Sequence, residues 1–146
     1  MTSFEIGAFS ATPFGKLDYV ALLVDRLDEA SAHYRETFRA TVTPPQDYAQ
    51  YGFCSAYVDL GYARLKLMQP LERPDTIVNL PEDRARSGLH HVSYQVEHLV
   101  ALRERLIDQG YRPYGSNEVT EVAGGRTTFL RPPDGIAPLV RLFEPA

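Results

Sequence analysis

Four side chains in this sequence could together move a proton and stabilise negative charge: Tyr19, Lys66, His91 and Arg141. Histidine titrates near neutral pH and can act as a general acid or base. Phenol, ammonium and guanidinium groups lower the free-energy cost of charge that develops on a carbonyl oxygen. We therefore interpret His91, acting with Tyr19, as a proton carrier, and Lys66 and Arg141 as groups that stabilise an enolate or a carboxylate.

Lys66 has a second possible use as a nucleophile. Flanking cations would depress the pKa of its amine, and the free amine could then form a Schiff base with a ketone. We rank this use below electrostatic stabilisation.

An internal repeat indicates the elements that position these side chains. The segment L-D-Y-V-A-L-L-V-D-R-L beginning at Leu17 returns as L-H-H-V-S-Y-Q-V-E-H-L beginning at Leu89. Each copy starts as a short strand and continues with apolar residues spaced three and four apart, which is typical of a helix. The spacing predicts helices over 27–38 and 99–107, and Gly110 sits where a helix commonly stops.

Shorter strands follow each predicted helix. The first half has strand candidates at 41–44, 53–60 and 63–68, and the second half at 112–115, 126–130 and 138–143. The Pro-Pro-Asp-Gly segment at 132–135 is a strong turn signal. Each half is therefore predicted to be a βαβββ module, at about 17–71 and 88–145, joined by a charged, proline-containing link.

With these elements the chain resembles the vicinal oxygen chelate superfamily, which includes glyoxalase I, methylmalonyl-CoA epimerase, bleomycin-resistance proteins and extradiol dioxygenases. The resemblance covers roughly residues 16–145 and looks closest to the epimerase branch. It rests on the order and spacing of L-D-Y-V-A-L-L-V-D-R-L-D-E-A, H-Y-R-E-T-F, L-K-L-M-Q-P-L, G-L-H-H-V-S-Y-Q-V and P-P-D-G before P-L-V-R-L. It implies an α+β fold in which two βαβββ modules form a cup-shaped mixed β-sheet around a substrate and usually a divalent metal.

The resemblance also implies four metal-ligand positions, which fall on Tyr19, Lys66, His91 and Arg141. Only His91 is a residue type that such sites use, because a divalent cation prefers neutral imidazole or anionic donors to cationic side chains. We therefore expect neither a metal nor another cofactor. The glutamate that serves as base in the epimerases maps near Ser55, so the sequence argues twice against ordinary methylmalonyl-CoA epimerisation.

The inward face of the predicted sheet should carry a cationic, aromatic-lined pocket. Strand alternation places residues two apart on one face, so Leu65 and Leu67 should point toward the helices. The pocket favours an anionic or carbonyl-rich small molecule, since an opposite charge stabilises buried cations. The candidate substrate-binding residues are Ser55, Tyr57, Arg64, Met68, Gln95 and Phe143.

Three functional hypotheses follow. The leading one is a metal-independent isomerase or lyase performing enolisation, dehydration or cyclisation on a small carbonyl compound, with a CoA or carrier-protein thioester as one option. The alternative is a non-catalytic binding protein that resembles the bleomycin-resistance proteins and holds its ligand by aromatic packing. The third is a relocated metal site that uses His91 and carboxylates such as Asp59.

The cationic candidates also have a purely structural interpretation. Arg64 and Lys66 alternate with leucines and could be the solvated face of an amphipathic strand. Arg141 could form an ion pair with Asp59 or with a neighbouring glutamate.

The same holds for Tyr19 and His91, which could be pocket wall and a core hydrogen-bonding group. We interpret the other histidines, His33, His90 and His98, as structural or surface residues. His90 is expected on the face opposite to His91, because it is the next residue along the strand.

Composition sets the remaining expectations. A chain of 146 residues with 44% apolar residues fits one compact domain over 1–146. A net charge of −4 without a basic cluster argues against nucleic acid. No apolar stretch approaches the roughly 20 residues that span a bilayer, and the N-terminal segment does not resemble a secretory signal. A lone Cys54 fits a reducing compartment, so we expect a cytoplasmic protein. The resemblance further implies a homodimer.

Overall fold

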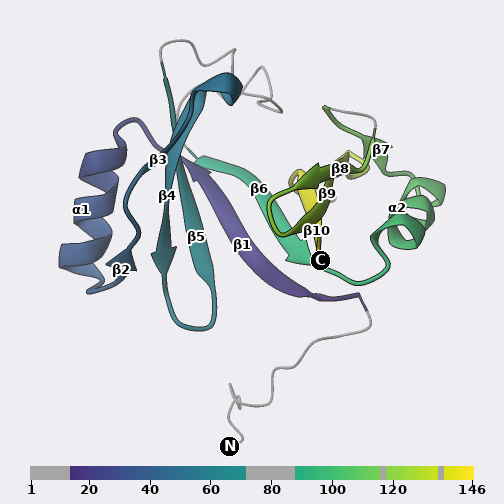
Figure 1. Cartoon of the computed structure of the whole chain (residues 1–146), viewed down its shortest axis with the longest axis horizontal. Coiled ribbons are helices and arrows are strands. Elements are labelled where there is room, and N and C mark those ends of the chain that lie inside the picture. Colours follow the sequence, from purple (N-terminus) through teal and green to yellow (C-terminus); the bar gives the residue numbers. More distant parts are fainter. Residues whose placement is uncertain (1–13, 72–87, 116–117, 135–136) are drawn as a thin grey trace, which may run out of the picture.

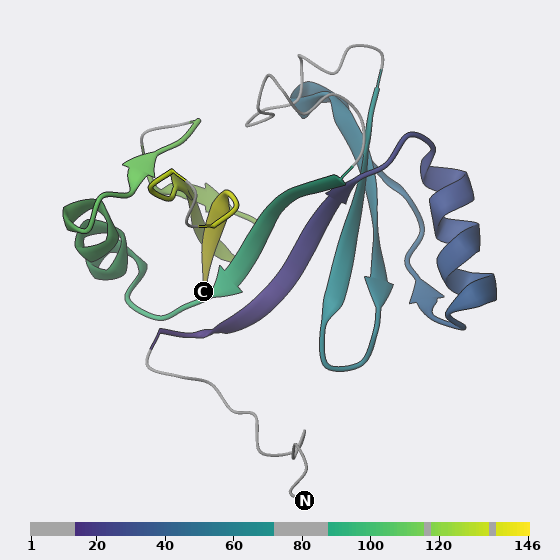
Figure 2. The ribbon, with the colours of Figure 1, turned by 180° about the vertical axis from the view of Figure 1, so that it is seen from behind.

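The fold is a curved, mixed β-sheet with one α-helix at each end (Figure 1; Figure 2 shows the same ribbon from behind). The computed structural model describes residues 14–71, 88–115, 118–134 and 137–146, so the predicted link and Gly135 of the predicted turn lie outside the described residues. Within these ranges, neither helix is long and apolar enough to cross a membrane.

Each half of the chain contributes the same series of elements. The first half contains β1 (Lys16–Leu23), α1 (Leu27–Thr37), β2 (Thr41–Val42), β3 (Gln46–Tyr48), a 3-10 turn (Ala49–Tyr51), β4 (Phe53–Asp59) and β5 (Arg64–Pro70). The second half contains β6 (Gly88–Gln95), α2 (Leu99–Asp108), β7 (Arg112–Pro113), β8 (Thr120–Val122), β9 (Gly125–Arg131) and β10 (Val140–Pro145).

The strand order of the sheet, β2-β4-β5-β1-β6-β10-β9-β7, is symmetric about its centre. The first strands of the two halves, β1 and β6, pair antiparallel in the middle, and each pairs parallel with the last strand of its own half. The repeated segments at Leu17 and Leu89 lie on these central strands (Figure 1). The prediction of an α+β fold with two βαβββ halves and a mixed sheet is confirmed.

The short strands differ from the prediction. The strand expected at 41–44 ends at Val42, and the one expected at 112–115 ends at Pro113, since Pro44 and Pro113 cannot donate a ladder hydrogen bond. Sequence reasoning missed β3 and β8, which pair with β4 and β9 respectively. Both are three residues long and mostly exposed, so pairing with a neighbour defines them and hydrophobic alternation does not.

Helix α1 covers the outer face of the first half of the sheet. Asp28 and Glu29 lie in its first turn, where negative charge is favourable beside the unpaired backbone N–H groups. Leu27 packs with a cluster of sheet residues that includes Leu65 and Leu67. The expectation that these two leucines point toward a helix is confirmed.

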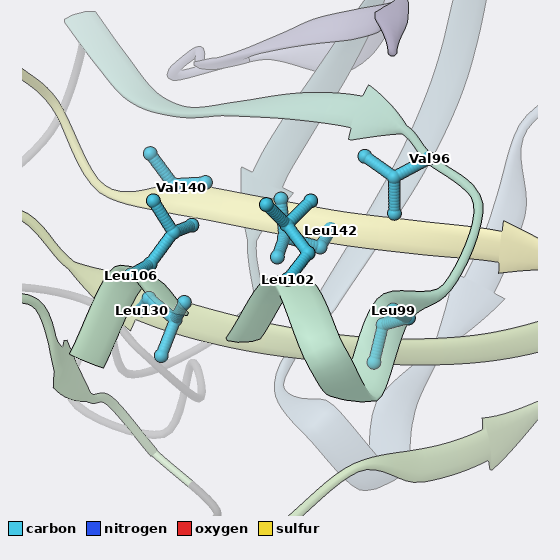
Figure 3. Close-up of a cluster of buried hydrophobic side chains, with 7 residues drawn as sticks. All are labelled: Val96, Leu99, Leu102, Leu106, Leu130, Val140 and Leu142. Carbon is cyan, nitrogen blue, oxygen red and sulfur yellow. The ribbon is translucent and has the colours of Figure 1, made fainter. Parts of the chain in front are cut away.

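Helix α2 covers the outer face of the second half (Figure 3). Its first turn is held by Glu144, whose carboxylate accepts hydrogen bonds from the backbone N–H groups of His98 at 2.9 Å and Leu99 at 3.4 Å. The helix ends just before Gly110, whose φ of 104° is the left-handed conformation expected at a helix stop. The cluster beneath it consists of Val96, Leu99, Leu102, Leu106, Leu130, Val140 and Leu142.

Replacing Leu99 with alanine is expected to lower the free energy of unfolding by about 3 kcal/mol, because the side chain is fully buried and its loss leaves a cavity. Val100→Ala is the matched control on the same helix. Val100 is 42% exposed, so its truncation should cost less than about 1 kcal/mol. Urea denaturation followed by circular dichroism measures both, and equal losses would contradict the packing described here.

Candidate functional site

The candidate residues lie in two rows across the face of the sheet that the helices leave open. In the first row, Ala21 on β1 pairs with Lys66 on β5 and His91 on β6, and Lys66 pairs with Tyr57 on β4. In the second row, Ser93 on β6 pairs with Tyr19 on β1 and with Arg141 on β10. Directly paired residues share a face, so strands from both halves supply one site.

The Tyr19 phenol stands at the centre of this site. Its Oη lies 3.1 Å from His91 Nε2 in a hydrogen bond, and both side chains are only 2% exposed. Around the Tyr19 ring, the Lys66 Nζ lies 5.4 Å and the Arg141 Cζ 5.6 Å from the centroid. The structure therefore brings together the four residues proposed for catalysis.

Burial keeps Tyr19 and His91 neutral. Burial raises the pKa of Tyr19 well above its ordinary range, although the Arg141 charge partly opposes this. Burial also lowers the pKa of His91 well below its ordinary value, with further lowering by His90, Lys66 and Arg141. A neutral imidazole has one N–H donor and one acceptor nitrogen, so the pair can pass a proton without creating a net charge.

Lys66 is half-buried among aromatic rings. Its Nζ lies 5.3 Å from the ring centroid of Phe53, 5.4 Å from Tyr19, 5.7 Å from Tyr48 and 5.9 Å from Tyr57. The pKa of Lys66 is lowered to about 8, mainly by burial and then by the charges of Arg141 and Arg64, while Asp18 opposes this shift. The amine is therefore present in both protonation states near neutral pH.

This pKa has a consequence for stability. The unfolded chain keeps the Lys66 proton up to about pH 10.5, whereas the folded chain releases it near pH 8. Between these values the unfolded state binds more protons, so the free energy of unfolding rises with pH. Across this pH window the free energy of unfolding of the wild type should rise by about 1–3 kcal/mol relative to that of Lys66→Met, after allowance for partial solvent screening.

Denaturation at a series of pH values measures this difference. The control is Lys16→Met, because Lys16 is exposed at the start of β1. In this variant the pH-dependent gain from Lys66 should be retained. A constant difference between Lys66→Met and the wild type would contradict a lowered pKa at Lys66.

Asp18 is a member of the site that sequence reasoning missed. Its carboxylate accepts hydrogen bonds from Arg64 Nη2 at 2.8 Å and from Ser93 Oγ at 3.0 Å, and Arg141 Nη1 lies 3.4 Å away. Arg141 also donates to Ser93 Oγ at 3.1 Å. Arg141 thus has an ion-pair partner, but the partner is Asp18 and not the expected Asp59 or glutamate. The carboxylate holds together cations from the two halves of the chain.

A β-bulge explains why alternation missed Asp18. Along β1, Leu17 pairs with Tyr94 and Tyr19 pairs with Ser93, which leaves Asp18 as an extra residue. An extra residue interrupts the in-and-out alternation of a strand. Asp18 therefore reaches the same site as Tyr19, its neighbour in sequence.

The equivalent bulge in the second half contains His90. Ala21 pairs with His91 and Leu22 pairs with Leu89, so His90 is the extra residue on β6. The expectation that His90 faces away from His91 is wrong, because its Nδ1 lies 2.6 Å from His91 Nδ1. In the repeat, D-Y at 18–19 aligns with H-H at 90–91. Two adjacent polar residues at both equivalent positions were the signal that could have revealed the bulges.

Two facing Nδ1 atoms need one proton between them to form a hydrogen bond, so the two rings are expected to be opposite tautomers. Long-range ¹H–¹⁵N correlation spectra at neutral pH distinguish Nδ1–H from Nε2–H in each histidine. One of His90 and His91 should show Nδ1–H and the other Nε2–H. In His90→Leu the His91 pattern should change, whereas His33→Gln on the exposed face of α1 should leave it unchanged. Identical tautomers in the wild type would contradict this bond.

The six substrate-binding candidates occupy different depths. Ser55 and Met68 pair with each other and are 2% and 3% exposed, so they lie in the floor of the site. Tyr57 is half-buried, and its ring centroid lies 4.5 Å from the Cζ of the exposed Arg64. The remaining two, Gln95 on β6 and Phe143 on β10, pair two residues beyond the second row along their strands, and the Phe143 ring centroid lies 5.1 Å from the Arg141 Cζ.

A cleft of about 510 Å³ adjoins the exposed side of the site. Tyr57, Arg64 and Gln95 line it, together with Asp18 and residues of the loop between β4 and β5. Its size falls in the range of small-molecule pockets. A ligand in this cleft would contact Arg64 and Tyr57, whereas the buried Tyr19 and His91 do not line it.

The residues at the four implied metal positions do not fit a divalent cation. Lys66 and Arg141 are cationic side chains, Tyr19 is held as a neutral phenol, and His91 Nε2 already bonds to that phenol. Within the described ranges, no group of three or more His, Cys, Asp and Glu side chains is arranged to hold a metal ion. The relocated site with His91 and Asp59 therefore has no support among these residues.

Comparison with protein families and curated proteins gives one consistent result. Residues 18–129 match the family model described as the Glyoxalase/Bleomycin resistance protein/Dioxygenase superfamily. An ethylmalonyl-CoA/methylmalonyl-CoA epimerase of Cereibacter sphaeroides is 36% identical over 131 residues, which cover 89% of this chain and 98% of that protein. The mitochondrial methylmalonyl-CoA epimerase of Mus musculus is 28% identical over 155 residues, with coverage of 98% and 87%.

The fold shows the same relationship. The crystal structure of methylmalonyl-CoA epimerase from Mycobacterium tuberculosis superposes with a TM-score of 0.73 at 25% sequence identity. The superposition covers 95% of this chain and 94% of that one. The cup-shaped vicinal oxygen chelate fold and the similarity to the epimerase branch are both confirmed.

Proposed function

Because this chain belongs to the glyoxalase/bleomycin resistance protein/dioxygenase superfamily, we propose that it is a metal-independent isomerase that moves a proton beside the carbonyl of an acyl thioester. The relatives support the reaction class and the substrate class, since those with the greatest similarity reported above are epimerases of acyl-CoA thioesters. The residues at the four implied metal-ligand positions support chemistry without a metal, because Lys66 and Arg141 are cationic side chains. The same groups would serve a lyase-type dehydration or cyclisation, which we rank second because no such relative supports it.

In this proposal His91 and Tyr19 carry the proton, and Lys66 and Arg141 stabilise the enolate or a carboxylate of the substrate. Removing a proton beside a thioester carbonyl places negative charge on the carbonyl oxygen, which fixed cations stabilise in a partly water-excluded site. The observation that carries the proposal is the convergence of these groups: the 3.1 Å Tyr19–His91 hydrogen bond, with Lys66 and Arg141 beside the same phenol ring.

One observation favours the alternative of a binding protein. Tyr19 and His91 are only 2% exposed, and Tyr57, Lys66 and Arg64 lie against the Tyr19 ring. For the pair to act on a substrate, Tyr57 and Lys66 must move when the substrate binds. In a binding protein, Tyr19 and His91 would only support the aromatic and cationic side chains that contact the ligand.

Exchange of the substrate α-proton distinguishes these functions. Metal-free protein is incubated in D₂O and chelator with methylmalonyl-CoA, with ethylmalonyl-CoA and with a range of other acyl thioesters, and deuterium at the α-carbon is followed by mass spectrometry. The proposal expects catalytic exchange for at least one thioester. Saturable binding without exchange would support the binding protein. Exchange that needs an added divalent metal would overturn the metal-independent mechanism.

A further inference from the structure

Lys66 is one of only two lysines in the chain, and the other, Lys16, lies exposed at the edge of the cleft. On β5 the Lys66 side chain projects from the open face of the sheet between Tyr57 and Ala21. Four aromatic ring centroids lie 5.3–5.9 Å from its Nζ. These rings partly desolvate the half-buried amine.

The charges around Lys66 favour a free amine. Among the described residues, no carboxylate oxygen lies within the 4.0 Å ion-pair distance of its Nζ, since Asp18 pairs with Arg64 and Arg141. The two guanidinium groups add positive charge nearby, which disfavours a third cation and lowers the pKa of the amine. A desolvated lysine beside other cations is the arrangement that activates an amine as a nucleophile.

We propose that Lys66 is a covalent site for small carboxylate-bearing aldehydes and ketones, with which its amine forms a reversible imine. The Nζ lone pair attacks the carbonyl carbon and gives a carbinolamine after proton transfer from nitrogen to oxygen. Loss of that oxygen as water leaves the C=N bond. Protonation of the imine restores one positive charge, which the four aromatic rings accommodate as they do the ammonium group.

The arginines account for the selectivity of this site. Arg141 and Arg64 both lie within 6 Å of the Tyr19 ring centroid, as does Lys66. A carbonyl compound bound at Lys66 would therefore place its carboxylate near a guanidinium group. This activity is independent of the proposed isomerase, because it needs neither a thioester nor the Tyr19–His91 pair.

The test uses the full-length protein and glyoxylate, with sodium cyanoborohydride to trap the imine as a secondary amine. Peptide mapping by mass spectrometry compares the adduct at Lys66 with that at Lys16 in the same molecules. At pH 7.5 roughly a quarter of an amine of pKa 8 is neutral, against roughly a thousandth for an ordinary lysine. We expect at least about tenfold more adduct at Lys66 than at Lys16. The expected excess is smaller than the ratio of the neutral fractions, because a less basic amine is also a weaker nucleophile. Equal labelling, or labelling mainly at Lys16, would overturn the proposal.

A second comparison tests the selectivity for an anion. Arg141→Gln should reduce the glyoxylate adduct at Lys66 several-fold more than the acetaldehyde adduct, because acetaldehyde has no carboxylate and is affected only through the Lys66 pKa, which the Arg141 charge lowers. A parallel loss with both probes would overturn the role of Arg141, and the melting temperature reports whether the variant is folded. α-Proton exchange is measured separately, so failure of imine trapping and failure of the proposed isomerase are distinguishable.

Discussion

His91→Gln is expected to lower kcat for α-proton exchange of the acyl thioester by about a hundredfold or more, which is the usual range for loss of a positioned acid or base. The glutamine amide can still hydrogen-bond to the Tyr19 phenol, but it cannot accept and release a proton near neutral pH. The substitution therefore separates proton transfer from packing. Deuterium incorporation measured under substrate saturation gives kcat directly.

The matched control is His33→Gln, which makes the same change on the exposed face of α1. It should leave kcat within about twofold, since surface substitutions away from a site seldom have large effects. Tyr19→Phe should resemble His91→Gln, because it removes the other member of the pair. Full activity in His91→Gln would refute the proton-carrier role and favour Lys66 as the base.

Asp18→Asn is expected to lower the free energy of unfolding by about 1–3 kcal/mol. Removing a carboxylate from a buried ion pair leaves its cations uncompensated, although the full effect is discounted here because Arg64 is partly exposed. The side chains of Asp18 and Arg141 are 9% and 16% exposed, so this half of the cluster is the less screened one. Urea denaturation measures the loss.

Asp25→Asn makes the same change at an exposed carboxylate that follows β1 and should leave stability nearly unchanged. The double variant Asp18→Asn with Arg141→Gln tests the pairing itself. If the two residues stabilise each other, the double variant loses less than the sum of the single losses. Strict additivity would mean that the 3.4 Å contact contributes little.

The fold could be predicted from the sequence because the same strand-and-helix pattern occurs twice in the chain. The apolar residues that follow Leu17 recur after Leu89, and the helical spacing after each copy is long enough to be read without neighbours. Strands β3 and β8 could not be predicted in this way, because three exposed residues carry no hydrophobic period and only pairing defines them.

The site was predictable where strands are regular. Alternation placed Tyr19, Lys66 and His91 on one face, and the register confirms that placement. It failed at Asp18 and His90 because each is the extra residue of a bulge, and bulges depend on the partner strand as well as on the strand itself. Strand alternation alone therefore predicts the cationic residues of this site but not Asp18, the carboxylate that pairs with the two arginines.

The antiparallel pairing of β1 with β6 makes the candidate site a product of late folding. Tyr19 and His91 are 72 positions apart, and Asp18 and Arg141 are 123 apart. Contacts between such distant positions form only after large loops have closed, and each half of the chain can acquire its own helix and hairpins before that. A chain with only one half ordered would therefore contain half of the chemical groups and no proton-carrying pair, so proton-transfer activity would report the assembly of the two halves.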